Sequence, residues 1–206
     1  ALVNCTSITV QNLNLTKNGQ GVLLAFTTNS TVTHNNVTNN YYGVHLYYSS
    51  NGNNITGNSI SDSTTYGIYS YWSSNNTIVE NNITKNGYGM YNGGIGLTYS
   101  SYTRISENNI TENNPYGIYF SSSNYNSIYA NNVTKNKQHG IYFYSSSNNN
   151  HIHANNITEN DGSGASLSGN NNEVNGNNIR NNAGNGISLS GTNNSAYKNT
   201  IIGNNN

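Results

Sequence analysis

The chain has 206 residues, a formal net charge of +0 and only 7% charged residues, so neither a basic nucleic-acid footprint nor electrostatic attraction to a membrane surface is available. The hydrophobic fraction is 33%, but 18 Tyr and a single Pro are untypical of a disordered chain. The composition therefore favours a folded protein with a thin core. No apolar run reaches the roughly 18 residues of a membrane span, and no signal peptide precedes Ala1, so an exported chain would be the mature form.

Along the whole chain a unit of roughly 22 to 24 residues repeats, a period that suits one coil of a parallel β-helix. The unit reads Ile-x-x-Asn-Asn-Ile-Thr-x-Asn, then Gly-Ile-x-Leu/Phe, then a Ser/Asn-rich turn. We predict a single all-β domain over residues 1–206, a single-stranded right-handed parallel β-helix of about nine coils. The fourth unit carries roughly four extra residues around Gly87 to Gly93, which predicts a surface loop.

Each unit contributes an apolar residue that should face the interior. In chain order these are Leu15, Val37, Ile60, Ile83, Ile110, Val133, Ile157, Ile179 and Ile201. Asparagine occurs two residues before and three residues after most of them, as in Asn81 and Asn86. Because neighbouring coils lie about 4.8 Å apart, these asparagines should form interior amide ladders.

A glycine column follows in each unit, which predicts either a positive φ or a close backbone approach. It runs through Gly21, Gly43, Gly67, Gly94, Gly117, Gly140, Gly164 and Gly186. After it, period-two alternation supplies inward pairs such as Ile118 and Phe120.

Charged residues supply an independent test of this alignment. One column alternates in sign over five successive coils: Asp62, Lys85, Glu112, Lys135 and Glu159. Stacked like charges would repel, so the alternation favours this register over a slip by one coil. Cys5 is the only cysteine, which excludes an internal disulfide and predicts a small buried residue.

With these columns in place, the chain resembles the NosD-like parallel β-helix repeat family of the pectate-lyase-like superfamily. The resemblance rests on Asn-x-Ile-x-x-Asn followed by Gly-Ile, as in Asn81 to Asn86 and Asn108 to Gly117, and covers nearly the whole chain. Versions rich in Asn and Tyr look like secreted surface-layer and sheath proteins of methanogenic archaea. The resemblance implies an extracellular location, but this fold carries many functions.

The superfamily contains polysaccharide lyases and hydrolases, so the resemblance makes enzymatic activity one alternative. Glu80 and Glu107 share a column on adjacent coils, with Arg104 close by in the sequence. Acid/base chemistry needs clustered acids. These three residues are weak candidates, and a neutralised structural pair is the preferred interpretation, so no enzymatic activity is predicted.

NosD-like proteins are associated with copper, which makes metal handling a second alternative. His151 and His153 flank an inward Ile152 and should point outward together. Two imidazoles make a weak site, and we predict neither a metal nor another cofactor.

Glycan binding is a further alternative, because aromatic faces are common sugar platforms. Tyr69, Tyr119 and Tyr142 are expected to share an outward column with His45. A second column, expected to face inward, comprises Phe26, Tyr48, Trp72 and Tyr99.

The preferred function is a non-enzymatic building block of an extracellular coat, sheath or filament. The expected partners are other copies of the chain, lateral or head-to-tail, because the last unit ends before a Gly-Ile strand and the first begins at one. Ladders continued across such a junction would give amyloid-like resistance to denaturants. Covalent glycans are also expected, at outward Asn-x-Ser/Thr sequons preceding the inward apolar residue: Asn14, Asn36, Asn82, Asn109, Asn132 and Asn156.

Overall fold

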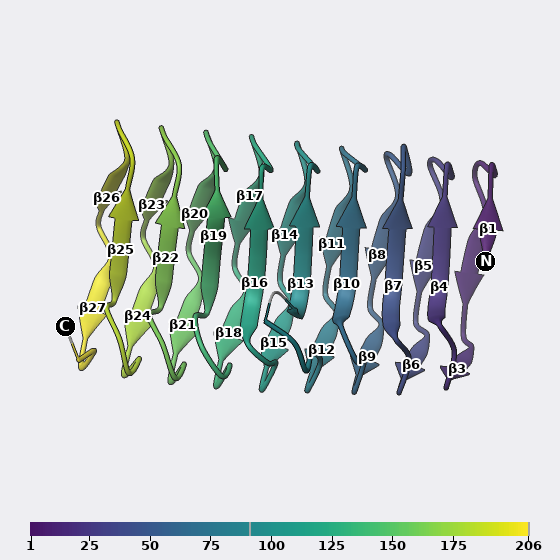
Figure 1. Cartoon of the computed structure of the whole chain (residues 1–206), viewed down its shortest axis with the longest axis horizontal. Helices are drawn as coiled ribbons and strands as arrows, with labels where there is room; N and C mark the ends of the chain where they lie inside the picture. The colour runs from purple at the N-terminus through teal and green to yellow at the C-terminus, as the bar shows by residue number, and fades with distance from the viewer. Residues whose placement is uncertain (91, 206) are drawn as a thin grey trace.

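The computed structural model describes residues 1–90 and 92–205, in which the chain winds through nine coils that lie side by side along one axis (Figure 1). Each coil gives one strand to each of three parallel nine-stranded sheets, named sheets 1, 2 and 3 here. The predicted parallel β-helix of about nine coils is confirmed. No helix long and apolar enough to cross a membrane occurs in the described ranges.

The strands of sheet 1 are the longest, and those of sheets 2 and 3 are short. Sheet 1 contains β1 (Leu2–Val3), β4 (Gln20–Ala25), β7 (Tyr42–Tyr47), β10 (Tyr66–Tyr71), β13 (Gly93–Thr98), β16 (Tyr116–Ser121), β19 (Ile141–Ser145), β22 (Ala165–Ser168) and β25 (Ile187–Ser190). Sheet 2 contains β2 (Thr9–Gln11), β5 (Thr31–Thr33), β8 (Asn54–Thr56), β11 (Thr77–Val79), β14 (Arg104–Ser106), β17 (Ser127–Tyr129), β20 (His151–His153), β23 (Glu173–Asn175) and β26 (Ser195–Tyr197). Sheet 3 contains β3 (Asn14–Thr16), β6 (Asn36–Thr38), β9 (Ser59–Ser61), β12 (Asn82–Thr84), β15 (Asn109–Thr111), β18 (Asn132–Thr134), β21 (Asn156–Thr158), β24 (Asn178–Arg180) and β27 (Thr200–Ile202).

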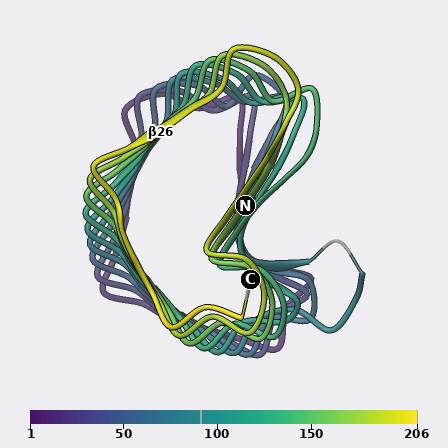
Figure 2. The same cartoon turned by 90° about the vertical axis from the view of Figure 1, so that its left-hand side faces the viewer.

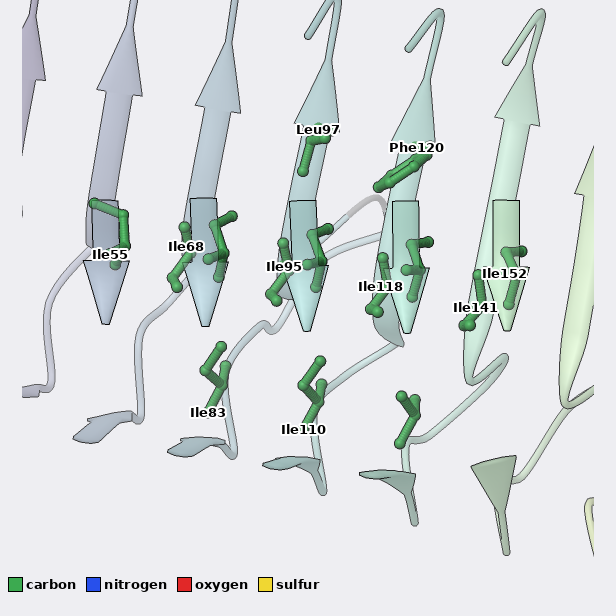
Figure 3. Close-up of a cluster of buried hydrophobic side chains, with 14 of the residues drawn as sticks. Ile55, Ile68, Ile83, Ile95, Leu97, Ile110, Ile118, Phe120, Ile141 and Ile152 are labelled. Carbon is green, nitrogen blue, oxygen red and sulfur yellow. The ribbon is translucent and has the colours of Figure 1, made fainter. Parts of the chain in front are cut away.

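The core is a continuous column of aliphatic and aromatic side chains inside the coils (Figure 3). The predicted register holds: Ile83 pairs with Ile110, and both are fully buried. Phe120 stacks on Phe143 of the next coil, with ring centroids 4.6 Å apart. Fully burying such a side chain stabilises the fold by roughly 1.5–3 kcal/mol.

Interior asparagine ladders satisfy the polar groups at the corners of the coils. Asn108 donates from Nδ2 to Asn131 Oδ1 at 2.9 Å and to the carbonyl oxygen of Ile78 at 3.0 Å. Its Oδ1 accepts from Asn81 N at 2.9 Å and from Asn81 Nδ2 at 3.0 Å. The predicted ladders are therefore confirmed, and Asn108 meets the rule that a buried amide must be hydrogen-bonded, whereas Asn76 Nδ2 has no partner among the described residues.

Each corner also contains a residue with a positive φ that shifts the in–out alternation by one position. Trp72 has φ 51°, directly after the last residue of β10. The next residue, Ser73, then faces inward and is fully buried. This shift makes one prediction wrong, because four aromatic residues expected inside are instead exposed: Phe26, Tyr48, Trp72 and Tyr99.

The structure decides between the two reasons for the glycine column that the sequence leaves open, a positive φ or a close backbone approach. Its members lack a positive φ, whereas a Cβ on Gly43 would lie 2.3 Å from the carbonyl oxygen of Gly67 and 2.6 Å from Ile60 Cγ2. Close backbone approach is therefore the reason for glycine here.

Seen along the axis, the coil outline is indented on the side of sheet 1, and the inserted loop that contains Gly87–Met90 leaves the outline next to this indentation (Figure 2). The loop prediction is confirmed for the described residues. Cys5 is a free thiol that is half-buried rather than buried as expected, because it lies at the corner after the short strand β1.

The predicted alternating charge column lies at the corner that leads from sheet 3 to sheet 1. Lys85 Nζ lies 3.9 Å from Glu112 Oε2, and Lys135 Nζ lies 3.7 Å from Glu159 Oε2. These exposed pairs contribute only about 0–1 kcal/mol each. Their main effect is on register.

Candidate functional site

The outer face of sheet 1 carries stacked aromatic columns. One column is the predicted outward set, His45, Tyr69, Tyr119 and Tyr142. His45 pairs with Tyr69 and Tyr119 pairs with Tyr142, while Gly96 lies between Tyr69 and Tyr119. A column just before the glycines was not recognised in the sequence: Tyr42, Tyr66 and Tyr116. The two columns interlock, since the Tyr66 and Tyr69 rings stack with centroids 4.7 Å apart and the Tyr116 and Tyr142 rings lie 4.7 Å apart.

At the fifth coil the aromatic columns are interrupted. In β13 the equivalent positions hold Gly93, Gly96 and Thr98. Tyr66 fills part of the space above Gly96, where an added Cβ would lie 2.4 Å from Tyr66 Cε1. The signal for this feature is present in the sequence, because Gly93 and Gly96 stand where neighbouring coils have tyrosines in two columns.

The interruption leaves a cleft of about 400 Å³ in the aromatic face. We call this the aromatic cleft; it is lined by Tyr42, Tyr66, Tyr69, Asn92, Thr98, Tyr119, Ser121 and Tyr144. The volume lies within the range of about 300–1,000 Å³ that is typical of small-ligand sites. The lining combines flat apolar rings with hydroxyl and amide groups.

The phenol groups of Tyr66 and Tyr69 remain protonated at neutral pH. Burial, reinforced by neighbouring tyrosines, raises the pKa of Tyr66 well above its ordinary value of 10. Burial also raises the pKa of Tyr69. Both hydroxyls are therefore neutral groups that can donate as well as accept hydrogen bonds.

His45 lies under the same aromatic face. Its ring stacks on Tyr42 at a centroid distance of 4.5 Å and on Tyr69 at 5.4 Å. The side chain is buried, and neither ring nitrogen has a hydrogen-bond partner among the described residues. Burial lowers the pKa of His45 from 6.5 to about 4, so the ring is neutral at physiological pH.

An exposed aromatic ridge borders this face, formed by the residues that were wrongly placed inside. Trp72 and Tyr99 stack with centroids 4.4 Å apart and are 48% and 45% exposed. Tyr71 of sheet 1 lies 6.3 Å from Tyr99, so the ridge and the aromatic face are continuous.

The weak catalytic candidates do not meet at the cleft. Glu80 and Glu107 lie on adjacent coils as predicted, both exposed and with positive φ, at the corner between sheets 2 and 3. Arg104 donates from Nη1 to Tyr129 Oη at 2.8 Å. None of the ion pairs between described residues joins Arg104 to either glutamate.

The histidine pair lies on sheet 2, also away from the cleft. His151 and His153 point outward together as predicted, and their rings stack with centroids 4.1 Å apart. His151 Nε2 lies 3.7 Å from Glu173 Oε1. Burial, and then the neighbouring His151, lower the pKa of His153. No group of three potential metal ligands occurs among residues 1–90 and 92–205.

The sequon asparagines form an outward ladder along sheet 3. Asn109 Nδ2 donates to Asn82 Oδ1 at 2.8 Å, and Asn132 Nδ2 donates to Asn109 Oδ1 at 2.9 Å. Their predicted outward orientation is confirmed. Glycosylation of these residues stays a prediction.

A larger groove, of about 580 Å³, is lined by the charge column. Its charges pair with one another, including Lys137 Nζ and Asp161 Oδ2 at 3.4 Å. Because these groups already have partners, the aromatic cleft is the stronger candidate site.

Two family models match the sequence. The model described as the right handed beta helix region matches residues 88–206, and that of the periplasmic copper-binding protein NosD matches residues 1–93. The residues of the segment that the NosD model matches do not fit a copper site. Cys5 follows β1, His34 follows β5 on another sheet, and His45 is stacked against tyrosine rings. No curated protein has a significantly similar sequence.

Solved structures share the fold at low identity. The periplasmic alginate epimerase AlgG is 19% identical with a TM-score of 0.72, over 87% of this chain and 50% of that chain. The Dettilon tailspike protein is 17% identical with a TM-score of 0.61, over 97% and 54%. The A-module of the Azotobacter vinelandii mannuronan C-5 epimerase AlgE6 is 15% identical with a TM-score of 0.60, over 95% and 58%. The chain thus spans about half the length of these structures.

Proposed function

Because the chain belongs to the right-handed β-helix family, we propose that its aromatic cleft binds a polysaccharide outside the cytoplasm. The observation that carries the proposal is the interruption of the aromatic columns at Gly96, which opens a space walled by tyrosine rings and lined with hydroxyl groups. Sugar rings have apolar C–H faces and hydroxyl edges, and both find matching groups in this cleft.

The comparisons support this proposal by analogy. AlgG is described as a periplasmic alginate epimerase and AlgE6 as a mannuronan epimerase, so both names denote proteins that act on polysaccharides. AlgG and NosD are described as periplasmic. An extracellular or periplasmic location is therefore part of the proposal.

The test is affinity electrophoresis of the intact chain in gels containing a panel of polysaccharides. We expect at least one polymer to retard the chain, and the double substitution Tyr69→Ala/Tyr119→Ala to abolish the retardation. Tyr102→Ala is the matched control, because Tyr102 is an exposed, stacked tyrosine that does not line the cleft. Equal retardation of all three proteins, or no retardation by any polymer, would contradict the proposal.

We further propose that binding occurs without cleavage. Glu80 and Glu107 lie outside the cleft, and the described residues that line it carry no carboxylate for acid/base work. The measurement is the chain length of a bound polymer after long incubation. Shortening that disappears in the Glu80→Gln/Glu107→Gln variant would establish an enzyme instead.

A structural role in a coat, sheath or filament is the second candidate. The interior amide ladder favours it, since hydrogen bonds join the coils from Asn35 to Asn199 and make a stiff rod. Polysaccharide binding would then attach the rod to a matrix. Self-association of the chain stays a prediction, and analytical ultracentrifugation tests it: a monomer at high concentration would exclude it.

A further inference from the structure

The nine strands of sheet 1 contain no Asp, Glu, Lys or Arg. From this and the cleft lining we infer that the ligand of the aromatic cleft is an uncharged polysaccharide. This inference rests on the function proposed above and names its substrate class.

The cations of the chain lie elsewhere. Four lysines follow the strands of sheet 3, while the remaining cations lie on or next to sheets 2 and 3. In order they are Lys17, Lys85, Arg104, Lys135, Lys137, Arg180 and Lys198. None lines the aromatic cleft.

A uronate polymer would therefore bring carboxylates against aromatic rings without a cation to pair with them. Removing a carboxylate from water without a partner is strongly unfavourable. The side chains that could respond are all uncharged: the phenols of Tyr66 and Tyr69, and the imidazole of His45, which stacks on Tyr69. A neutral sugar has no such cost.

The hydrogen-bonding groups of the cleft suit hydroxyls. Thr98 and Ser121 contribute hydroxyls from neighbouring coils, where the two residues pair in the sheet. Asn92 adds an amide that both donates and accepts. The walls, Tyr69 on the fourth coil and Tyr119 on the sixth, are two coil steps apart, or about 9.6 Å at the usual strand spacing. The ring of Tyr66 lies in this gap, with its centroid 4.7 Å from that of Tyr69 and 6.4 Å from that of Tyr119, so a bound sugar would lie against these rings and not between Tyr69 and Tyr119.

The experiment compares matched pairs of polymers that share linkage and anomeric configuration and differ only by oxidation at C6: a mannan with mannuronan, a glucan with glucuronan, and an α-linked galactan with polygalacturonate. Dissociation constants are measured with the intact chain at low and high salt. We expect the neutral member of any bound pair to bind at least about tenfold more tightly, with little change on adding salt, because no ion pair forms.

A designed cation provides the second arm. Thr98→Lys places an ammonium in the cleft and should raise the affinity for the acidic member by about tenfold, with a new salt dependence. Thr111→Lys is the matched control, because Thr111 is a half-buried threonine at the end of a strand of sheet 3.

The outcomes separate the two proposals. An acidic polymer that binds the unaltered chain as tightly as its neutral partner, or more tightly, overturns the inference and leaves polysaccharide binding intact. Unchanged affinity of Thr98→Lys for every acidic polymer also counts against the inference. No binding to any of the six polymers overturns the proposed function itself.

Discussion

The ring of Tyr66 occupies the place that a side chain on Gly96 would take: a Cβ there would lie 2.4 Å from Tyr66 Cε1 and 2.6 Å from Cζ. Tyr66 reaches this position because it belongs to the preceding coil and stacks on Tyr69 of its own strand. The glycine therefore shapes the aromatic cleft twice, by opening it and by setting the position of one wall.

Gly96→Ala should displace Tyr66 from its stack. Overpacking of this kind typically destabilises a fold by about 1–3 kcal/mol, and we expect a value in that range from urea unfolding. Gly19→Ala is the matched control, because no atom of the described residues lies within 4 Å of an added Cβ there and its φ is not positive. If both variants unfold at the same urea concentration, the packing of Tyr66 over Gly96 does not contribute to the stability of the fold.

Removal of one interior ladder asparagine should be far more damaging than removal of its exposed neighbour. Asn108→Ala deprives the buried N–H of Asn81 and the carbonyl of Ile78 of their partners, and each unsatisfied group costs about 1–3 kcal/mol. We expect a total loss of about 3 kcal/mol or more. Asn109→Ala removes only exposed side-chain bonds and should cost less than about 1 kcal/mol. Similar losses for both would show that the interior ladder is dispensable.

Stability should fall at acidic pH through His45. Its pKa is lowered from 6.5 to about 4 in the folded chain, so the unfolded chain binds more protons between these values. The contribution of His45 to the free energy of unfolding is complete above about pH 6.5. It is lost as the pH falls to about 4, which lowers the free energy of unfolding by about 3 kcal/mol. The groups facing His45 are Tyr42, Tyr47 and Tyr69, none of them charged.

The variant His45→Phe isolates this effect, since it keeps a stacked ring and removes the titration. Urea unfolding at pH 7.5 and pH 4 should show a smaller pH-dependent loss in the variant than in the unaltered chain, by about 3 kcal/mol. Equal losses in the two proteins would contradict the assignment.

Glycans on the outward sequon ladder should occupy alternate coils. Coils are about 4.8 Å apart, too close for sugars on direct neighbours such as Asn82 and Asn109. The neighbouring pair Asn14 and Asn36 can then carry one glycan. The run of sequons from Asn82 to Asn156 can carry two glycans, so a chain carries at most three. Intact-mass analysis of native protein should exceed the 22.3 kDa of the bare chain. A mass equal to the bare chain would refute glycosylation.

Much of the fold could be predicted because one coil repeats. Ile83, Ile110 and Val133 recur at the same point of each unit, so equivalent positions stack about 4.8 Å apart in neighbouring coils. The same alignment of the coils places the opposite charges of Lys85 and Glu112 next to each other. The asparagine ladders follow from that alignment, since a buried amide needs a partner and the nearest one is its equivalent in the next coil.

The orientation of Trp72 and the aromatic cleft were decided by tertiary structure. A residue with positive φ at each corner shifts the alternation by one, and no local pattern marks it, because Trp72, Glu80 and Lys85 all adopt this conformation. The cleft depends on Tyr66 leaning toward Gly96 of the next coil, a contact between residues 30 positions apart that periodicity aligns but does not orient. The sequence by itself thus determined which residues stack, because stacking follows the repeat. Which side chains cover a neighbouring gap depends on packing between coils, which only the folded chain settles.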